Sequence, residues 1–378
     1  MADVAPVTPD PGISDQTKGE LNVPAHADEV AEINQKVHYE VAKLAANPAD
    51  PVIVPAVRQW LINEMLLQGN AGSTTPSYEG TYSSALNREF SNLLSQPDTA
   101  VNTRLNIGII INQLQGKTEN LAPTVVQLLQ DKSGAVVLWG EKAAGAILPV
   151  AVQDPAFNGG MRDKVLAAIV DAVIAHPDDK VSGMIADEAY RAINPEMNDW
   201  PHGLFPPANA LVALVDANLR LQKSRIEIYK NTGVPESPLS DTYASYLLLG
   251  FNSVWSTLAP AQQLAAAQQA SDLIWLAAQR AAGRPNNQND ELINALNEEG
   301  QWIASMGKWM QDANLQTIGA GVSLSVASPA NTILDVCKAV YPAMQADFPT
   351  LAPPPSLDNS KSASDTSGPT TAASEAQR

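Results

Sequence analysis

Apolar residues recur every three or four positions through most of this chain, the spacing that places them on one face of an α-helix. The first run ends at Asn47-Pro48, because a proline disfavours helical backbone in the residue before it. That run comprises Val30, Ile33, Val37, Val41 and Leu44. Similar runs predict helices at residues 54–65, 86–94, 98–111, 123–129, 162–175 and 181–193, and one that opens at Ala135. The pattern therefore predicts an all-α fold.

The segment Ile107–Ile111 is a continuous apolar run, which is compatible with a buried strand as well as with a helix. We predict a helix, because Val101, Leu105 and Ile109 keep a spacing of four and no turn residue separates them. This interpretation places Val101 and Leu105 on the inward face.

Polar turns that contain Asp or Pro separate the helices of the first half, and a valine marks the opening of every second helix. These valines are Val57, Val101, Val136 and Val181. The intervals between them are 44, 35 and 45 residues. Two helices in each interval of this length are typical of helical-repeat arrays.

The best of these units contains Leu129, Asp131, Val136 and Ala143, and the last contains Asp179, Val181, Ala186 and Ala189. Through these positions and the pair Val57-Arg58, residues 43–193 resemble HEAT and armadillo-like repeats. Asn102 and Val137 depart from the pattern, since a basic residue is common there. The resemblance implies an irregular α-solenoid of stacked helix pairs, a type of fold that mostly recognises proteins.

Prolines gather between the two halves of the chain, in Asn194-Pro195, Trp200-Pro201-His202-Gly203 and Pro206-Pro207. So many helix breakers in so short a stretch predict an irregular junction. Low apolar content predicts disorder at both ends. The predicted organisation is a disordered lead (1–26), a HEAT-like region (27–195), the junction (196–207), a helical region (208–350) and a disordered tail (351–378).

Beyond the junction, longer apolar stripes predict a bundle of helices at residues 208–229, 241–258, 261–282, 290–311 and 330–346. Gly300 and Gly307 share one stripe, although glycine costs about 1 kcal/mol in a helix interior relative to alanine. We interpret them as a place where another helix backbone comes close, with the small-residue face of 261–282 as its partner in an antiparallel hairpin. Only Ile318–Val326 has a strand-like pattern.

Charge restricts the possible partners. Forty acidic and 23 basic residues give a net charge of −17. An acidic surface repels nucleic-acid phosphates and anionic lipid headgroups, which argues against nucleic acid as a partner and favours a protein with a basic or neutral surface. No run of 18 uncharged apolar residues is present, so no membrane span is predicted. Met1–Pro24 lacks the features of a signal peptide, yet it has the Pro-rich composition of a mature exported chain, so cytoplasmic and exported locations both stay open.

Few side chains are suited to catalysis or to metal binding. The four histidines, His26, His38, His176 and His202, are isolated from one another, so neither a metal site nor a cofactor is predicted. His176 precedes Asp178 and Asp179, which we interpret as a turn that caps the next helix rather than as a cation site. The single cysteine, Cys337, lies on an apolar stripe and is predicted to be a buried core residue.

Two aromatic groups are candidates for binding. Trp302, Met306 and Trp309 line one flank of 290–311, and we predict that they pack in the core. Trp200, His202 and Phe205 lie in the junction loop, and loops on a rigid scaffold often bind partners or ligands. The alternative is that this loop simply fills the junction between two domains.

These observations favour a non-catalytic scaffold for protein–protein interactions. A second hypothesis is an all-α enzyme or small-ligand binder whose pocket lies at the junction, with His202 as its acid–base group. A third is a structural component of the cell envelope, suggested by the composition of the N-terminal residues.

Overall fold

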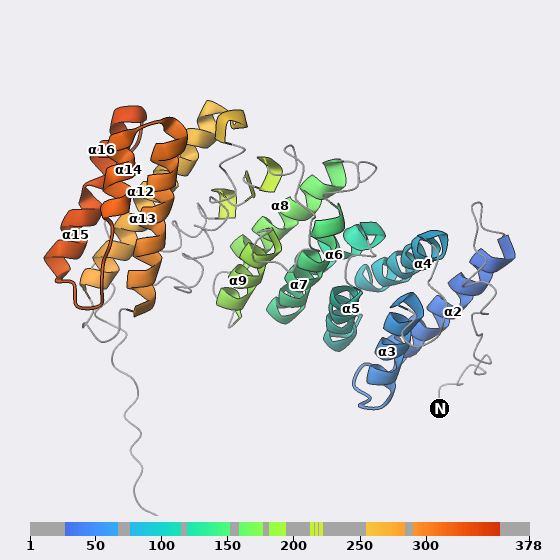
Figure 1. Cartoon of the computed structure of the whole chain (residues 1–378). Helices are drawn as coiled ribbons and strands as arrows, with labels where there is room; N and C mark the ends of the chain where they lie inside the picture. The colour runs from blue at the N-terminus through green and yellow to red at the C-terminus, as the bar shows by residue number, and fades with distance from the viewer. Residues whose placement is uncertain are drawn as a thin grey trace, which may run out of the picture. The chain divides into compact units, whose positions relative to one another are not determined.

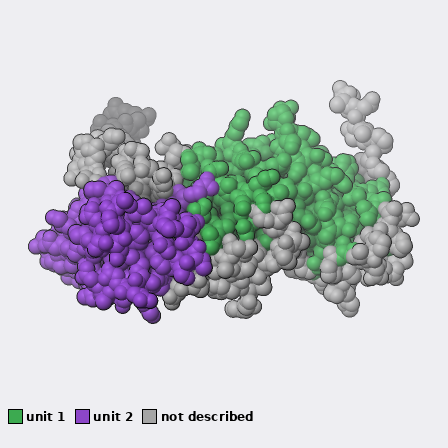
Figure 2. All heavy atoms as spheres, turned by 90° about the horizontal axis from the view of Figure 1, so that it is seen from above, with its two compact units in different colours: residues 1–218 green, residues 219–378 purple. Residues whose placement is uncertain are grey.

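The protein is all-α, as predicted. The computed structural model describes residues 27–66, 76–114, 119–151, 159–176, 181–193, 212–214, 216–217, 219–221, 255–283 and 290–355. Within these ranges all regular secondary structure is helical and no strand occurs. The chain forms two compact units, residues 1–218 and residues 219–378 (Figure 2). The predicted junction 196–207 and the predicted lead 1–26 lie outside the described residues.

The first unit contains eight described α-helices and one 3-10 turn. They are α2 (Ala27–Ala46), α3 (Ile53–Leu66), α4 (Pro76–Leu94), α5 (Val101–Gln113), η1 (Glu119–Leu121), α6 (Ala122–Leu129), α7 (Gly134–Ala151), α8 (Gly159–Ala175) and α9 (Ser182–Ile193). The prediction of a helix rather than a strand at Ile107–Ile111 is therefore confirmed.

Contacts among these helices follow their order in the chain. Consecutive helices contact each other in the pairs α2/α3, α4/α5, α6/α7 and α8/α9. Each helix also contacts the helix two places along, which gives one row of α2, α4, α6 and α8 and a second row of α3, α5, α7 and α9 (Figure 1). Between the rows lies a core of apolar side chains such as Leu61, Ile110 and Ile147.

Polar side chains close the turn between α2 and α3. The Asn47 side chain donates to the Lys43 carbonyl at the end of α2, at 2.8 Å. The Asp50 carboxylate accepts hydrogen bonds from the backbone N–H groups of Val52 and Ile53, at 2.8 and 2.9 Å. Both contacts satisfy backbone groups that a helix end leaves without an intrahelical partner. Side chains within the turn predicted at Asn47-Pro48 thus stabilise both the end of α2 and the start of α3.

Two predicted inward faces in the first unit are wrong in detail. Val101 is 45% exposed, and the buried face of α5 carries Ile107, Ile110 and Ile111 instead. The reason is the close approach of α7: a Cβ atom on Gly108 would lie 2.8 Å from Trp139 Cβ, so the glycine side of α5 faces α7. On α8 the predicted stripe is buried except at its end, where Ile174 is exposed.

The second unit contains five described α-helices and one 3-10 turn. They are η3 (Trp255–Thr257), α12 (Pro260–Ala282), α13 (Asp290–Met310), α14 (Ala313–Gly321), α15 (Ala330–Lys338) and α16 (Val340–Asp347). Helix α12 contacts α13, α15 and α16, while α14 packs on α13 and α16 (Figure 1). The predicted helices 208–229 and 241–258 lie mostly outside the described residues.

The glycine stripe of α13 meets a close backbone, as predicted, but its partner is α14 rather than α12. A Cβ atom on Gly307 would lie 2.5 Å from Gln316 N, and one on Gly300 would lie 2.9 Å from Gly319 O. The α14 backbone therefore occupies the space that side chains would take. Helices α12 and α13 do contact each other, through other residues.

Two further predictions in the second unit are wrong. The strand-like segment Ile318–Val326 begins inside α14 and continues as irregular backbone. The predicted helix 330–346 is divided into α15 and α16 at Ala339. Pro342 explains the division, because it has no N–H to donate to the carbonyl of Lys338 four residues earlier.

The predicted tail 351–378 starts with five described residues, which lie along α12. Gln268 and Gln279 on that helix form hydrogen bonds with the backbone of Ala352 and Pro355. Residues 356–378 lie outside the described residues. No helix within the described ranges has both the length and the apolar character needed to cross a lipid bilayer.

Candidate binding groove

The residues that the sequence suggests at the junction, Trp200, His202 and Phe205, lie outside the described residues, so their role stays a prediction. Asp178 and Asp179 lie outside them as well. His176 is described: its Nε2 is 3.1 Å from the backbone oxygen of Asp131, in the turn between α6 and α7. In the described part of the chain, no three His, Cys, Asp or Glu side chains gather where they would hold a metal ion.

The other candidates from the sequence belong to the core of the second unit. Trp302 and Met306 are buried, as predicted for core packing. Trp309 is half-buried, and its ring lies 5.9 Å from that of Trp255. Cys337 is buried too, and this burial raises the pKa of its thiol to about 12. None of these side chains forms an open binding surface.

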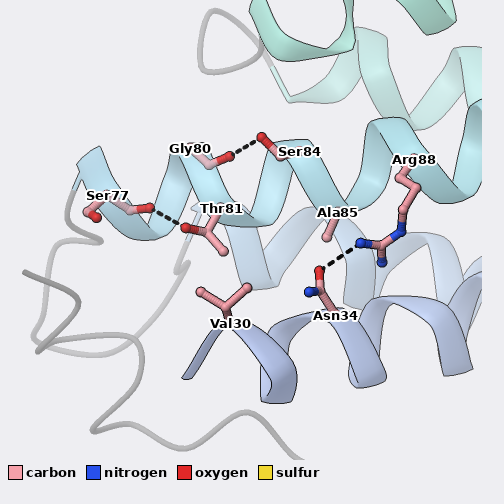
Figure 3. Close-up of a pocket in the computed structure, with 8 residues that line it drawn as sticks. All are labelled: Val30, Asn34, Ser77, Gly80, Thr81, Ser84, Ala85 and Arg88. Atoms are coloured by element: carbon pink, nitrogen blue, oxygen red, sulfur yellow. Dashed lines mark hydrogen bonds between the residues drawn. The ribbon is translucent and has the colours of Figure 1, made fainter. Parts of the chain in front are cut away.

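A shallow, open groove lies between α2 and α4 (Figure 3). It has a volume of about 470 Å³. Helix α2 contributes Val30 and Asn34 from its first turns. Helix α4 contributes six residues at helical spacing, Ser77, Gly80, Thr81, Ser84, Ala85 and Arg88. The packing of α2 on α4 therefore creates the groove, and both helices belong to the row formed by α2, α4, α6 and α8.

Hydroxyl groups dominate the α4 wall. The Thr81 hydroxyl donates to the Ser77 carbonyl at 2.9 Å, and the Ser84 hydroxyl donates to the Gly80 carbonyl at 2.7 Å (Figure 3). These bonds use the hydroxyl hydrogens and leave oxygen lone pairs as acceptors. Beside them Gly80 leaves a gap, because a Cβ atom placed on it would have no neighbour within 4 Å. The wall is thus suited to a ligand that donates hydrogen bonds.

Arg88 closes one end of the groove, and its charge is balanced locally. Its Nη1 donates to Asn34 Oδ1 at 3.2 Å, across the groove (Figure 3). Its Nε and Nη2 donate to Glu89 Oε1 at 3.0 and 2.9 Å, while His38 Nδ1 lies 2.8 Å from Glu89 Oε2. Partial burial alone would raise the pKa of Glu89, but the hydrogen bonds with His38 and Arg88 hold it below its ordinary value. The groove consequently has no unbalanced cation that would select an anion.

Helix α2 carries a buried ion pair on a different face from the groove. Lys36 Nζ lies 3.0 Å from Glu40 Oε1, and both side chains are buried. The same ammonium group lies 4.6 Å from the centre of the Trp60 ring on α3, within the range of a cation–π interaction. Nearby, the Tyr82 hydroxyl donates to the Leu61 carbonyl at 3.1 Å. These contacts tie α2 and α4 to α3, so the two walls of the groove have a fixed support.

The lining of the groove contains no side chain that usually serves as an acid–base group. None of its eight lining residues is an Asp, Glu, His, Lys or Cys, so the lining has no general base and no activated nucleophile. The Thr81 and Ser84 hydroxyls are engaged with their own helix. The apolar spacing of α2 and α4 does not reveal this groove, because the lining residues of α4 are mostly small and polar. The small polar residues Ser77, Thr81 and Ser84, at spacings of four and three, were the signal available.

A chain of polar contacts connects the turns of the first unit. Arg104 Nε lies 2.7 Å from Asp131 Oδ2, and Arg104 also donates to the Thr99 carbonyl in the turn before α5. Asp131 accepts from the Ser133 backbone N–H at 2.8 Å, and its own backbone oxygen meets His176. The turns that precede α5, α7 and α9 are therefore linked in series.

The sequence matches no protein-family model and has no significant match among curated proteins.

Proposed function

We propose that this protein is a non-catalytic scaffold for protein–protein interactions, with a first unit that is an irregular HEAT-like array of helix pairs. The observation that carries the proposal is the order of helix contacts. In the described part of the first unit, every substantial contact joins helices no more than two places apart. Helices wrapped around one common centre would also bring the first pair against the last. An array of stacked pairs has only neighbour contacts.

A repeated aspartate in the turns supports the same interpretation. Asp50, Asp98, Asp131 and Asp179 each stand three residues before the first residue of α3, α5, α7 and α9. Asp50 and Asp131 both accept the backbone N–H two residues further on. The valines used to find the repeat are less regular, because Val57 lies well inside α3 whereas Val181 precedes α9. The aspartate is therefore the better mark of the repeated unit.

The arrangement of this array can be tested through the range of a local perturbation. Leu61 in α3 and Ile185 in α9 are both completely buried, so replacing either by alanine should cost about 2–5 kcal/mol. In a stacked array, Leu61→Ala should accelerate amide hydrogen exchange in α2–α5 and leave α8 and α9 unchanged. Ile185→Ala should do the reverse. Uniform acceleration of all eight helices by either variant would reject the array.

The groove between α2 and α4 supports the binding role, and the net charge of −17 favours a basic protein partner. A basic segment brings N–H donors, which match the acceptor oxygens of Ser77, Thr81 and Ser84. Electrostatic attraction of this kind weakens as salt increases. Partner binding should therefore be strong at low ionic strength and weaker at high ionic strength.

Leucine at position 80 is the matched probe of the groove. Gly80→Leu places a bulky side chain in open space, so it should block the groove while the fold is kept. Gly321→Leu is the control, since a Cβ atom there also has no neighbour within 4 Å, in the second unit. A partner that the original protein captures from the host lysate should also be captured by the Gly321→Leu variant but not by the Gly80→Leu variant. Equal capture by both variants would exclude the groove, and capture insensitive to salt would remove the electrostatic part.

The pocket around His202 and the cell-envelope role stay hypotheses. The first rests on residues outside the described ranges, and no described contact favours the second.

A further inference from the structure

The start of the C-terminal segment is held along α12 by two glutamine side chains. Gln268 forms a two-point contact with the backbone of one residue: its Nε2 donates to the Ala352 carbonyl at 3.0 Å, and its Oε1 accepts the Ala352 N–H at 2.7 Å. Gln279 Nε2 donates to the Pro355 carbonyl at 3.2 Å. Both glutamines therefore bind the backbone of the segment and not its side chains.

The α12 residues involved share one face of the helix. Trp275 and Gln279 follow Gln268 by seven and eleven residues, which places all three within about 20° of one direction around the axis. Trp275 is half-buried. Asp272, on the same face, accepts the second N–H of the Gln268 amide at 2.8 Å, so that amide is already oriented for the peptide. We refer to Gln268, Asp272, Trp275 and Gln279 as the glutamine face.

The bound segment has the chemistry that this face requires. Its sequence is Leu351-Ala352-Pro353-Pro354-Pro355, and prolines offer carbonyl acceptors but no N–H donors. Side-chain amides supply the donors that such a backbone lacks. Consecutive prolines also favour an extended polyproline II conformation before binding, so little conformational entropy is lost when they dock. At the start of the segment, Leu351 is buried and its carbonyl accepts from the Tyr341 hydroxyl at 3.3 Å.

We propose that the glutamine face is a binding site for extended proline-rich peptides, and that Leu351–Pro355 of this same chain is its resident ligand. The site lies in the second unit and is independent of the groove and of the proposed array. Because the contacts are made to the backbone, the face tolerates other side chains at position 352. The resident segment is tethered, which gives it an effective concentration of about millimolar and keeps weaker competitors out.

Hydrogen exchange in the full chain tests the contact itself. Gln268→Ala removes both hydrogen bonds to Ala352, so the Ala352 amide should exchange about tenfold faster. Gln263→Ala is the matched control, because this glutamine also lies on α12 but donates to the Trp255 carbonyl instead. Exchange at Ala352 that is unchanged by Gln268→Ala would overturn the proposal. Protection that increases with protein concentration would show that the segment comes from a second copy, and this would overturn its assignment as the resident ligand.

Peptide binding in trans tests the site as a receptor. A chain that ends at Leu351 keeps the buried leucine and leaves the glutamine face open. Titration with the acetylated, amidated peptide Ala-Pro-Pro-Pro-Ser should shift the side-chain amide NMR signals of Gln268 and Gln279 saturably at millimolar concentration. The peptide Ala-Gly-Gly-Gly-Ser should bind at least about tenfold more weakly, because glycines lose more conformational entropy on binding. Equal binding of the two peptides, or no shift with either, would refute the proposal. If the shortened chain does not fold, the exchange experiment on the full chain decides alone.

Discussion

Replacing Gly319 in α14 by alanine should destabilise the second unit, because the α13 and α14 backbones meet at this residue. A Cβ atom there would clash with Ala304 N and would lie 2.7 Å from Gly300 O. Both are backbone atoms, so no side-chain rotation relieves the clash and one helix must shift. Overpacking of this kind costs about 1–3 kcal/mol, and a clash with backbone belongs at the upper end. Alanine regains up to about 1 kcal/mol of helix propensity, which leaves a net loss of about 2 kcal/mol.

Equilibrium unfolding in urea measures this loss, with Trp302 and Trp309 on α13 as fluorescent reporters of the second unit. Gly321→Ala is the matched control, since it lies two residues further along α14 and its Cβ would meet nothing within 4 Å. The control should be neutral or slightly stabilising. If Gly319→Ala and Gly321→Ala gave the same unfolding free energy, the close backbone approach would not be what holds α14 on α13.

Three other residues give expected outcomes of their own. Both carboxyl oxygens of Glu141 are buried with no hydrogen-bond partner among the described residues, and burial, with the charge of Glu188, raises its pKa well above the ordinary value. The unfolded chain releases the Glu141 proton at a lower pH than the folded protein does. The free energy of unfolding should therefore fall as pH rises above roughly pH 5, by up to about 1.4 kcal/mol per pH unit, and Glu141→Gln should remove this fall. Urea unfolding at pH 5 and pH 8 checks this, and an identical pH dependence of the two proteins would contradict it. Gln311 directly follows α13 and has a φ of 60°, so Gln311→Gly should stabilise the protein by about 0.5–1 kcal/mol, and a lower urea midpoint would count against it. With its pKa raised to about 12, Cys337 should react with iodoacetamide at pH 8 roughly a thousandfold more slowly in the folded protein than in urea, and comparable rates would show an accessible thiol.

The helices were predictable because residues at or next to their ends determine where they begin and end. Pro123 lies in the first turn of α6, Pro260 is the first residue of α12, and Gly283 directly follows the end of α12. The inward faces were less predictable. On α5 the residue that determines the inward face is Gly108, because its missing side chain lets Trp139 come close. Apolar periodicity does not reveal a contact that depends on a missing side chain.

The groove and the glutamine face escaped the sequence analysis for a related physical reason. Apolar spacing detects what a helix buries, whereas the α4 wall consists of small hydroxyl residues that carry no apolar signal. The groove exists only because α2 stands beside α4 at a certain separation, which the sequence of neither helix encodes alone. Likewise, Gln268 acquires a binding role only through a segment 84 residues further along the chain.

In the repeated unit that we propose, aspartate keeps a more regular position than valine, and the geometry of the turn explains why. A buried valine can sit at several positions along a helix, because the apolar stripe offers a place at every third or fourth residue. A carboxylate that accepts the backbone N–H two residues on, as Asp131 does from Ser133, works at only one position relative to the start of the helix. The geometry of the turn thus determines the sequence position of the aspartate. The helix that follows accepts a valine at several positions, so the valine position varies. Irregular intervals between valines are therefore compatible with a regular unit, and exchange experiments on Leu61→Ala and Ile185→Ala address that unit directly.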